Sequence, residues 1–220
     1  MKKKICISWS GGRDSMVMLD RLHSSSDWKP AALLTTLAEE EQRVMMHDIP
    51  LSLLTKQADS LKLPLHTVMM KQGASNEEYE ESMRAALGSL SKQGIDTMAF
   101  GDIFLKDIKA YREDQMKKTT LEPVFPLWGD ATENLSREFI NKGYKAVLIC
   151  VDCSQLDSSF LGREYDEDLL RDLPDGIDPC GENGEFHTFV YDGPLFEKAV
   201  DYQLKDTVER YDRFLYWHIE

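Results

Sequence analysis

The octapeptide Ser8-Trp-Ser-Gly-Gly-Arg-Asp-Ser15 carries the strongest structural signal in this sequence of 220 residues. A short apolar run, residues 4–8, leads into it, and Met16, Val17 and Leu19 follow with the spacing of an amphipathic helix. Its two glycines can adopt positive φ and let the backbone approach an anion, while a helix N-terminus supplies free N–H groups. The order strand, glycine turn, helix therefore predicts a phosphate-binding loop.

The polar side chains of this loop also suit a nucleotide. Ser10 and Ser15 are hydroxyl donors, and Arg13 can make bidentate contacts with phosphate. Asp14 can help to hold Mg²⁺, or it can simply cap the helix of an ordinary glycine turn. The spacing fits neither G-x-x-x-x-G-K-S/T nor G-x-G-x-x-G, so a different type of phosphate loop is expected.

Short apolar runs alternate with helical patterns through the first two thirds of the sequence. Strands are predicted at residues 4–8, 31–36, 65–69, 97–100 and 146–151, with helical patterns between them. This alternation predicts an α/β fold with a doubly wound, Rossmann-like parallel sheet. Ligands of such sheets bind at the carboxyl ends of the strands.

The pattern changes after Cys153 to an acidic sequence rich in turns. Residues 166–172 are predicted to form a helix, residues 185–191 a strand, and residues 202–216 a helix-like stretch. We therefore expect an ATP-binding domain over residues 1–152 and a smaller substrate-binding region over residues 153–220.

Composition narrows the classes of function. The 26 basic and 39 acidic residues give a net charge of −13, which opposes sequence-independent binding to DNA. No stretch approaches the roughly 20 apolar residues of a membrane helix, and no signal sequence is evident, so a cytoplasmic protein is expected. The four cysteines are expected to be reduced, because disulfide frameworks belong mainly to small secreted domains.

Residues 10–15 resemble the S-G-G-x-D-S loop of the PP-loop ATP pyrophosphatases, which bind the pyrophosphate of ATP and release AMP. Further blocks resemble the diphthine-ammonia ligase family. These blocks are Arg43-Val-Met-Met-His47, Gly101-Asp-Ile103, Glu122-Pro-Val-Phe-Pro-Leu-Trp-Gly129 and Cys180-Gly-Glu-Asn-Gly-Glu-Phe-His-Thr188. Arg13 departs from the family, which more often has lysine there; the charge is retained, but the geometry of phosphate contacts differs.

The resemblance implies a fold of the adenine nucleotide alpha hydrolase type and an AMP-forming ligase that uses ATP and Mg²⁺. Its partners would be ammonia and a carboxylate acceptor, which is diphthine on elongation factor 2 if the organism makes diphthamide. The same ATP chemistry on another acceptor, in cobalamin-type salvage or sulfur transfer, is an alternative, as is a non-catalytic adenine-nucleotide sensor. The oligomeric state stays open, with a homodimer as one option.

The resemblance and the loop together predict three overlapping sets of site residues. The residues expected at the nucleotide are Ser8, Ser10, Gly11, Gly12, Arg13, Asp14, Ser15, Thr36, Met46, Gly101 and Asp102, with Asp14 and Asp102 on Mg²⁺. The expected catalytic residues are Arg13, Asp14, Asp102, Glu182, Glu185 and His187. The expected substrate-binding residues are Arg112, Glu113, Glu182, Asn183, Glu185 and His187.

The period of a strand places Glu185 and His187 on one face, where both could reach the same ligand. Carboxylates there would suit ammonium or a cationic substrate, and His187 could transfer a proton. Cys150, Cys153 and Cys180 with His187 also have the composition of a zinc site. That interpretation is disfavoured, because the sequence has no second C-x-x-C pair at a characteristic spacing.

Overall fold

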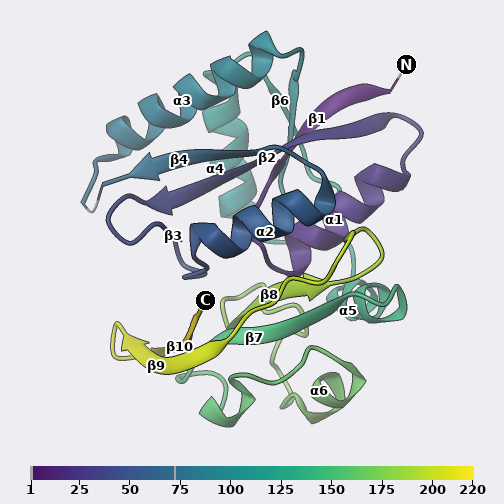
Figure 1. Cartoon of the computed structure of the whole chain (residues 1–220), viewed down its shortest axis with the longest axis vertical. Coiled ribbons are helices and arrows are strands. Elements are labelled where there is room, and N and C mark those ends of the chain that lie inside the picture. The colour runs from purple at the N-terminus through teal and green to yellow at the C-terminus, as the bar shows by residue number, and fades with distance from the viewer. Residues whose placement is uncertain (1, 72) are drawn as a thin grey trace.

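The computed structural model describes residues 2–71 and 73–220, and it contains two β-sheets with helices packed around them (Figure 1). The first sheet and its helices consist of β1 (Lys3–Ser8), α1 (Arg13–Ser24), β2 (Trp28–Ala38), β3 (Arg43–Val44), α2 (Leu51–Leu61), β4 (Leu65–Met70), α3 (Asn76–Lys92), β5 (Thr97–Ala99), α4 (Lys106–Lys117) and β6 (Glu122–Val124). The remaining elements are α5 (Thr132–Asn141), β7 (Lys145–Asp152), the short 3-10 helix η1 (Ser158–Phe160), α6 (Glu167–Asp172), β8 (Phe186–Asp192), β9 (Leu204–Arg210) and β10 (Phe214–Ile219).

The first sheet has parallel strands in the order β4-β2-β1-β5-β6. Successive residues of β1 enter different cores: Ile5 and Ile7 pack with α1 and α2, whereas Cys6 packs with α3 and α4. Because helices cover both faces of the central strand β1, its apolar run from Ile5 to Ile7 is continuous and does not alternate with polar residues. The predicted α/β fold with a doubly wound parallel sheet is confirmed.

β3 is a short antiparallel addition to this sheet. It pairs with Leu37 and Ala38 at the end of β2, past the point where β1 stops pairing with β2 at Leu34. The opposite edge of β2 is occupied by β4. β3 and the residues after it therefore lie beyond the carboxyl end of β1, next to the glycine loop.

The second sheet is antiparallel, with strand order β8-β7-β10-β9. The strand predicted at 146–151 exists as β7, but it belongs to this sheet and not to the parallel one. The helix-like stretch predicted over 202–216 is wrong, because β9 and β10 form a hairpin there. The predicted α6 and β8 are present. Whether residues 1–152 form a separate domain stays a prediction.

The two sheets lie on either side of α1 and α2, as Figure 1 shows. Gln57 of α2, which is fully buried, connects them: its Nε2 donates to the carbonyl oxygens of Gly11 at 2.9 Å and Val190 at 2.6 Å, and its Oε1 accepts from Trp9 Nε1 at 3.0 Å. The Val190 N–H also donates to the Gly11 carbonyl at 3.0 Å. The glycine loop is thus fixed by α2 and by β8 of the second sheet.

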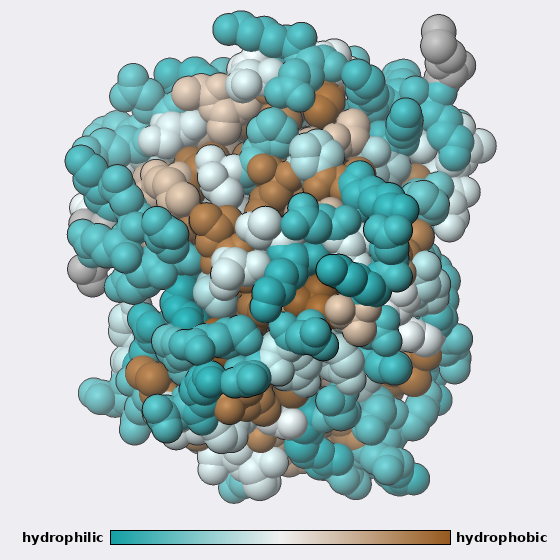
Figure 2. Space-filling model, in the orientation of Figure 1, coloured by the Kyte–Doolittle hydropathy of each residue, from teal (hydrophilic) through white to brown (hydrophobic). Residues whose placement is uncertain are grey.

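Gly11 has a φ of +82°, and a Cβ at this position would lie 2.8 Å from Leu54 Cδ2 and 2.9 Å from Gln57 Oε1. Any other residue would therefore meet both backbone strain and a steric clash. The outer surface is mostly hydrophilic on the face seen in Figure 2, with apolar residues in small groups among polar ones. Within residues 2–71 and 73–220, none of the helices combines the length and apolar character needed to span a membrane.

Candidate active site

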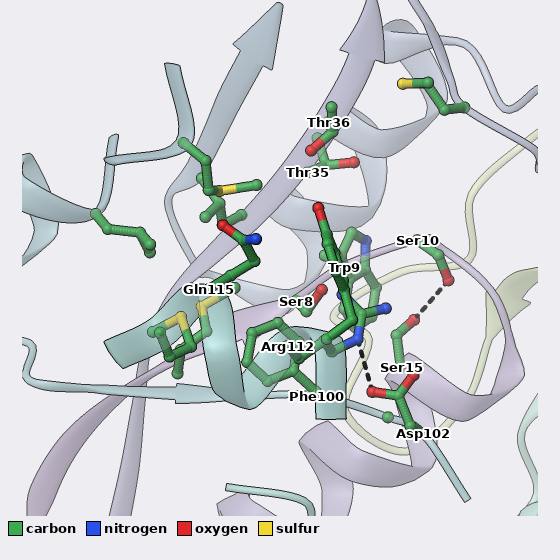
Figure 3. Close-up of a pocket in the computed structure, with 18 of the residues that line it drawn as sticks. Ser8, Trp9, Ser10, Ser15, Thr35, Thr36, Phe100, Asp102, Arg112 and Gln115 are labelled. Carbon is green, nitrogen blue, oxygen red and sulfur yellow. Dashed lines mark hydrogen bonds and ion pairs between the residues drawn. The ribbon is translucent and has the colours of Figure 1, made fainter. Parts of the chain in front are cut away.

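A cavity of about 580 Å³ opens at the carboxyl edge of the parallel sheet (Figure 3). This is the edge where the sequence places the ligand. The strand ends and the loops after them contribute Ser8, Ser10, Thr35, Thr36, Gly101 and Asp102 to its lining. The cavity therefore begins at the glycine loop and extends under α3 and α4.

The hydroxyl groups of the glycine loop bond to the loop itself. Ser15 Oγ donates to the Gly12 carbonyl at 2.8 Å, and Ser10 Oγ lies 3.4 Å from Ser15 Oγ (Figure 3). Gly12, not Asp14, occupies the N-cap position of α1, so the alternative in which Asp14 caps the helix is wrong. Asp14 lies in the first helical turn and lines the cavity.

Carboxylates converge at this end of the cavity, where Asp14, Asp102 and Glu182 all belong to its lining. Glu182 Oε1 accepts from the backbone N–H groups of Ile103 at 2.8 Å and Phe104 at 3.4 Å. Burial raises the pKa of Glu182 to about 7, and the nearby charges of Asp14 and Asp102 add to this effect. Burial also raises the pKa of Asp14, although Arg13 opposes the shift. A cation at this end would be stabilised by all three carboxylates.

Asp102 is held in place by α4. Arg112 Nε lies 2.7 Å from Asp102 Oδ2, and the Arg112 guanidinium stacks over Phe100 at 4.7 Å from the ring centroid (Figure 3). The structure thus brings Arg112 to the cavity. It does not bring Glu113, which pairs with Lys109 at 2.9 Å on the same helix.

Arg13 lies beneath the loop, outside the cavity. Its side chain is 1% exposed, its Nη2 donates to the Cys180 carbonyl at 2.9 Å, and it forms an ion pair with Asp14. The guanidinium carbon is 5.4 Å from the Tyr165 ring centroid. Burial by itself would lower the pKa of Arg13, but the nearby groups Asp14, Tyr165, Cys180 and Asp178 together outweigh burial, so the pKa is raised. The predicted contact of Arg13 with phosphate is not formed in this geometry.

Three more of the predicted site residues also lie outside the cavity: Asn183, Glu185 and His187. Glu185 is buried and accepts from the backbone N–H groups of Asp178 and Asn183 and from Asn183 Nδ2, each at 3.0 Å. His187 packs against the His47 ring with centroids 4.3 Å apart. Glu185 and Asn183 therefore shape the turn that carries Glu182, and the structure does not direct Glu185 and His187 to a common ligand.

Burial disfavours a charge on the histidine pair. It lowers the pKa of His47 to about 4, and the pKa of His187 falls well below its ordinary value, with His47 adding to the effect. His47 lines the cavity, whereas His187 belongs to β8 behind it. Both rings are neutral at neutral pH and act as a packed contact.

The other predicted nucleotide residues divide into two kinds. Those that line the cavity are Ser8, Ser10, Asp14, Ser15, Thr36, Met46, Gly101 and Asp102. Gly11 and Gly12 instead provide the backbone shape of the loop, and a Cβ at Gly12 would lie only 3.0 Å from the Thr188 carbonyl oxygen.

Apart from Arg112, sequence reasoning missed the wall that α3 and α4 form. Their other lining residues are Tyr79, Glu80, Met83, Arg84, Leu87, Tyr111, Gln115 and Met116. Glu80 connects the two helices, since it accepts from Gln115 Nε2 at 3.0 Å and Lys118 Nζ at 2.9 Å. The spacing of Tyr79, Met83 and Leu87 by four residues was the available signal for this inward face.

The cysteines are dispersed. All four carry free thiols, Cys150 is buried on β7, and Cys180 Sγ donates to the Thr132 carbonyl at 3.2 Å. Across the described part of the chain, no group of three or more His, Cys, Asp or Glu residues is arranged to hold a metal by itself.

A parallel α/β sheet whose first strand runs through a glycine loop into a helix, with a cavity at that loop, defines a doubly wound α/β protein whose candidate site lies at the carboxyl edge of the sheet. Comparison with known families then gives the particular one: the diphthamide synthase N-terminal domain matches residues 3–122, and the diphthamide synthase C-terminal domain matches residues 131–220. The chain belongs to this family, which confirms the resemblance in the sequence blocks.

Curated relatives named diphthine–ammonia ligase agree with this assignment. The proteins from Bos taurus and Homo sapiens are each 33% identical over 144 residues, which is 59% of this chain and 54% of theirs. The Schizosaccharomyces pombe protein is 26% identical over 220 residues, covering 91% of this chain and 36% of its own. The chain thus spans about half, or less, of the length of these relatives.

A solved structure, the U34-tRNA thiolase from Methanococcus maripaludis, aligns with a TM-score of 0.39 and 18% identity. The alignment covers 64% of this chain and 58% of the thiolase.

Proposed function

We propose that the protein is an ATP-dependent ligase that cleaves ATP to AMP and pyrophosphate and joins ammonia to a carboxylate. The observation that supports this most is the convergence of the glycine loop with Asp14, Asp102 and Glu182 at one end of a single cavity. Relatives in the same family carry the name diphthine–ammonia ligase. Diphthine is accordingly the first acceptor to test.

The two ends of the cavity suit the two ends of ATP. The loop end offers the hydroxyls of Ser10 and Ser15 and the N-terminus of α1 to the phosphates. The rest of the lining includes apolar and aromatic side chains, among them Met46, Tyr79 and Phe100, which suit the flat face of a base.

Mg²⁺ fits the carboxylates at the glycine-loop end of the cavity. It usually takes one or two carboxylates together with phosphate oxygens and water, and Asp14 and Asp102 meet that requirement. When bound, the ion would neutralise charge on the phosphates.

The reaction would proceed in two steps. The acceptor carboxylate oxygen attacks the α phosphorus, the bond to the β-phosphate oxygen breaks, and pyrophosphate leaves. Ammonia then attacks the acyl carbon, AMP leaves, and one proton is lost from nitrogen. Glu182, with a pKa of about 7, is suited to accept that proton through the oxygen not bonded to Ile103.

The test is calorimetric titration of ATP, AMP and pyrophosphate with Mg²⁺ into the wild type and an Asp14→Ala, Ser15→Ala double variant. Products are then analysed after incubation with isotopically labelled ammonia and diphthine-bearing elongation factor 2. We expect ATP to bind the wild type alone and labelled amide, AMP and pyrophosphate to appear together.

The failure modes separate the alternatives. No nucleotide binding overturns the proposal. Nucleotide binding without pyrophosphate release for any acceptor supports a non-catalytic sensor. Turnover with a cobalamin-type carboxylate but not with diphthine supports the same ATP chemistry on a different acceptor.

A further inference from the structure

Residues 45–48, between β3 and α2, form one wall of the cavity in an unusual backbone conformation. Met45, Met46 and His47 line the cavity. Met46 has a φ of +70° and Asp48 a φ of +56°, a region that residues other than glycine seldom adopt. Met45 and Met46 are 51% and 66% exposed, so burial of their side chains does not hold this conformation. Contacts from outside the segment are needed to hold it.

Two strands of the second sheet bond to this segment directly. Tyr216 of β10 donates its hydroxyl to the Met46 carbonyl at 3.0 Å. Arg210 of β9 donates through Nη2 to Asp48 Oδ1 at 2.9 Å. These bonds fall on the two positions with positive φ.

The same sheet makes two further contacts, one with the segment and one with Arg43 just before it. The His47 ring packs on His187 of β8 at 4.3 Å. Arg43, two residues before the segment, has its Nη2 2.7 Å from His218 Nε2 of β10 and its Nη1 2.6 Å from the Asp48 carbonyl. In Figure 1, β3 accordingly lies on the side of the large sheet that faces the β9–β10 hairpin.

We propose that the second sheet sets the shape of this wall, and that Tyr216 is a positioning residue for the nucleotide. Its hydroxyl fixes the peptide between Met46 and His47, both of which line the cavity. Without the bond, this peptide can rotate toward a less strained conformation and carry both side chains with it. The role in nucleotide binding rests on the function proposed above.

The test compares Tyr216→Phe with Tyr211→Phe in the full chain. Each variant loses one hydroxyl, but Tyr211 is 83% exposed in the turn between β9 and β10. Amide hydrogen exchange of residues 45–48, measured without ligand, shows how rigidly this wall is held. Calorimetry with Mg-ATP gives the Kd for the nucleotide. For Y216F we expect faster exchange in residues 45–48 and a Kd for ATP raised about 3- to 10-fold, the effect of one lost hydrogen bond.

The rate of pyrophosphate release at saturating ATP should stay unchanged in Y216F, since only binding geometry is affected, and Y211F should match the wild type throughout. Unchanged exchange in Y216F overturns the inference, as does faster exchange with an unchanged Kd. If the wild type binds no nucleotide, the proposed function fails, and the exchange data still decide whether Tyr216 holds the wall. Should Y216F not fold, Arg210→Gln breaks the bond to Asp48 from β9 and is expected to act in the same direction.

Discussion

Glu182 shows how strongly one side chain depends on its surroundings. Its pKa rises from 4.5 to about 7 through burial, so between these pH values the folded chain holds a proton that the unfolded chain has released. The carboxyl group therefore lowers the free energy of unfolding as pH rises from 4.5 to 7, and above 7 the full effect is present.

Glu182→Gln should reverse this effect, because the amide oxygen can still accept from the Ile103 N–H without carrying a charge. We expect the variant to be more stable than the wild type by about 1–2 kcal/mol near pH 8 and similar to it near pH 4, in urea unfolding at both pH values. Glu113→Gln, on a half-exposed ion pair, is the matched control and should change stability by less than about 0.5 kcal/mol. Equal or lower stability of E182Q near pH 8 would contradict the assignment.

Arg13 is a structural residue in this geometry, and this can be tested without nucleotide. Arg13→Met removes the partner of Asp14, whose side chain is 32% exposed, and leaves the Cys180 carbonyl without its donor, so we expect a loss of about 1–3 kcal/mol in unfolding free energy. Arg13→Lys keeps the charge but cannot serve both Asp14 and the Cys180 carbonyl as well, so a smaller loss of about 1–2 kcal/mol is expected. If both variants kept the thermal stability of the wild type but bound ATP more weakly, the result would instead support the predicted contact between Arg13 and phosphate.

At the scale of elements, α2 joins the glycine loop to β8 through Gln57. Gln57→Ala would leave the Val190 carbonyl and Trp9 Nε1 without this partner and would open a small void. We expect a loss of about 2–4 kcal/mol in unfolding free energy and weaker ATP binding. Ser52→Ala, at an exposed position of the same helix, is the control. Full ATP affinity in Q57A would show that the loop keeps its shape without this bridge.

The elements also show what could be predicted from the sequence. The β1, loop and α1 unit was found because its signal is local. β7 was found as a strand but placed in the wrong sheet, since an apolar run of this length looks the same whether its partners are parallel or antiparallel. β9 and β10 were missed because the turn between them uses Tyr211 and Asp212 at φ +58° and +51°, so no glycine marks it.

The candidate site was predicted where it depends on nearby sequence and missed where it depends on distant contacts. Asp14 and Ser15 follow from the loop itself. The inward turn of Arg13 depends on Cys180 and Tyr165, far along the chain, and local sequence cannot indicate it. The structural role of Glu185, which accepts hydrogen bonds within its own turn, could not be predicted either. A buried carboxylate and an exposed one look the same in the sequence.

At the scale of the whole molecule, the histidine pair couples the two sheets to pH. An unfolded histidine takes up a proton near pH 6.5, whereas burial lowers the pKa of folded His47 to about 4. Between these values the unfolded chain binds more protons, so the free energy of unfolding should fall as pH is lowered from 6.5 to 4.

His47→Gln should flatten this dependence, with the loss of stability between about pH 7 and pH 5 smaller than in the wild type by about 1–2 kcal/mol. His23→Gln, on the last turn of α1, provides the comparison and should retain the wild-type slope. An identical slope in H47Q and the wild type would contradict a lowered pKa of His47.

The bond from Val190 to the Gly11 carbonyl has a consequence for synthesis of the chain. Translation delivers the N-terminus first, so the glycine loop leaves the ribosome long before β8 exists to shape it. An early segment of the chain therefore depends on a late one for its final set of bonds. A nascent chain that lacks β8 also lacks the donor to the Gly11 carbonyl, so the loop reaches its complete set of bonds only after β8 has been made.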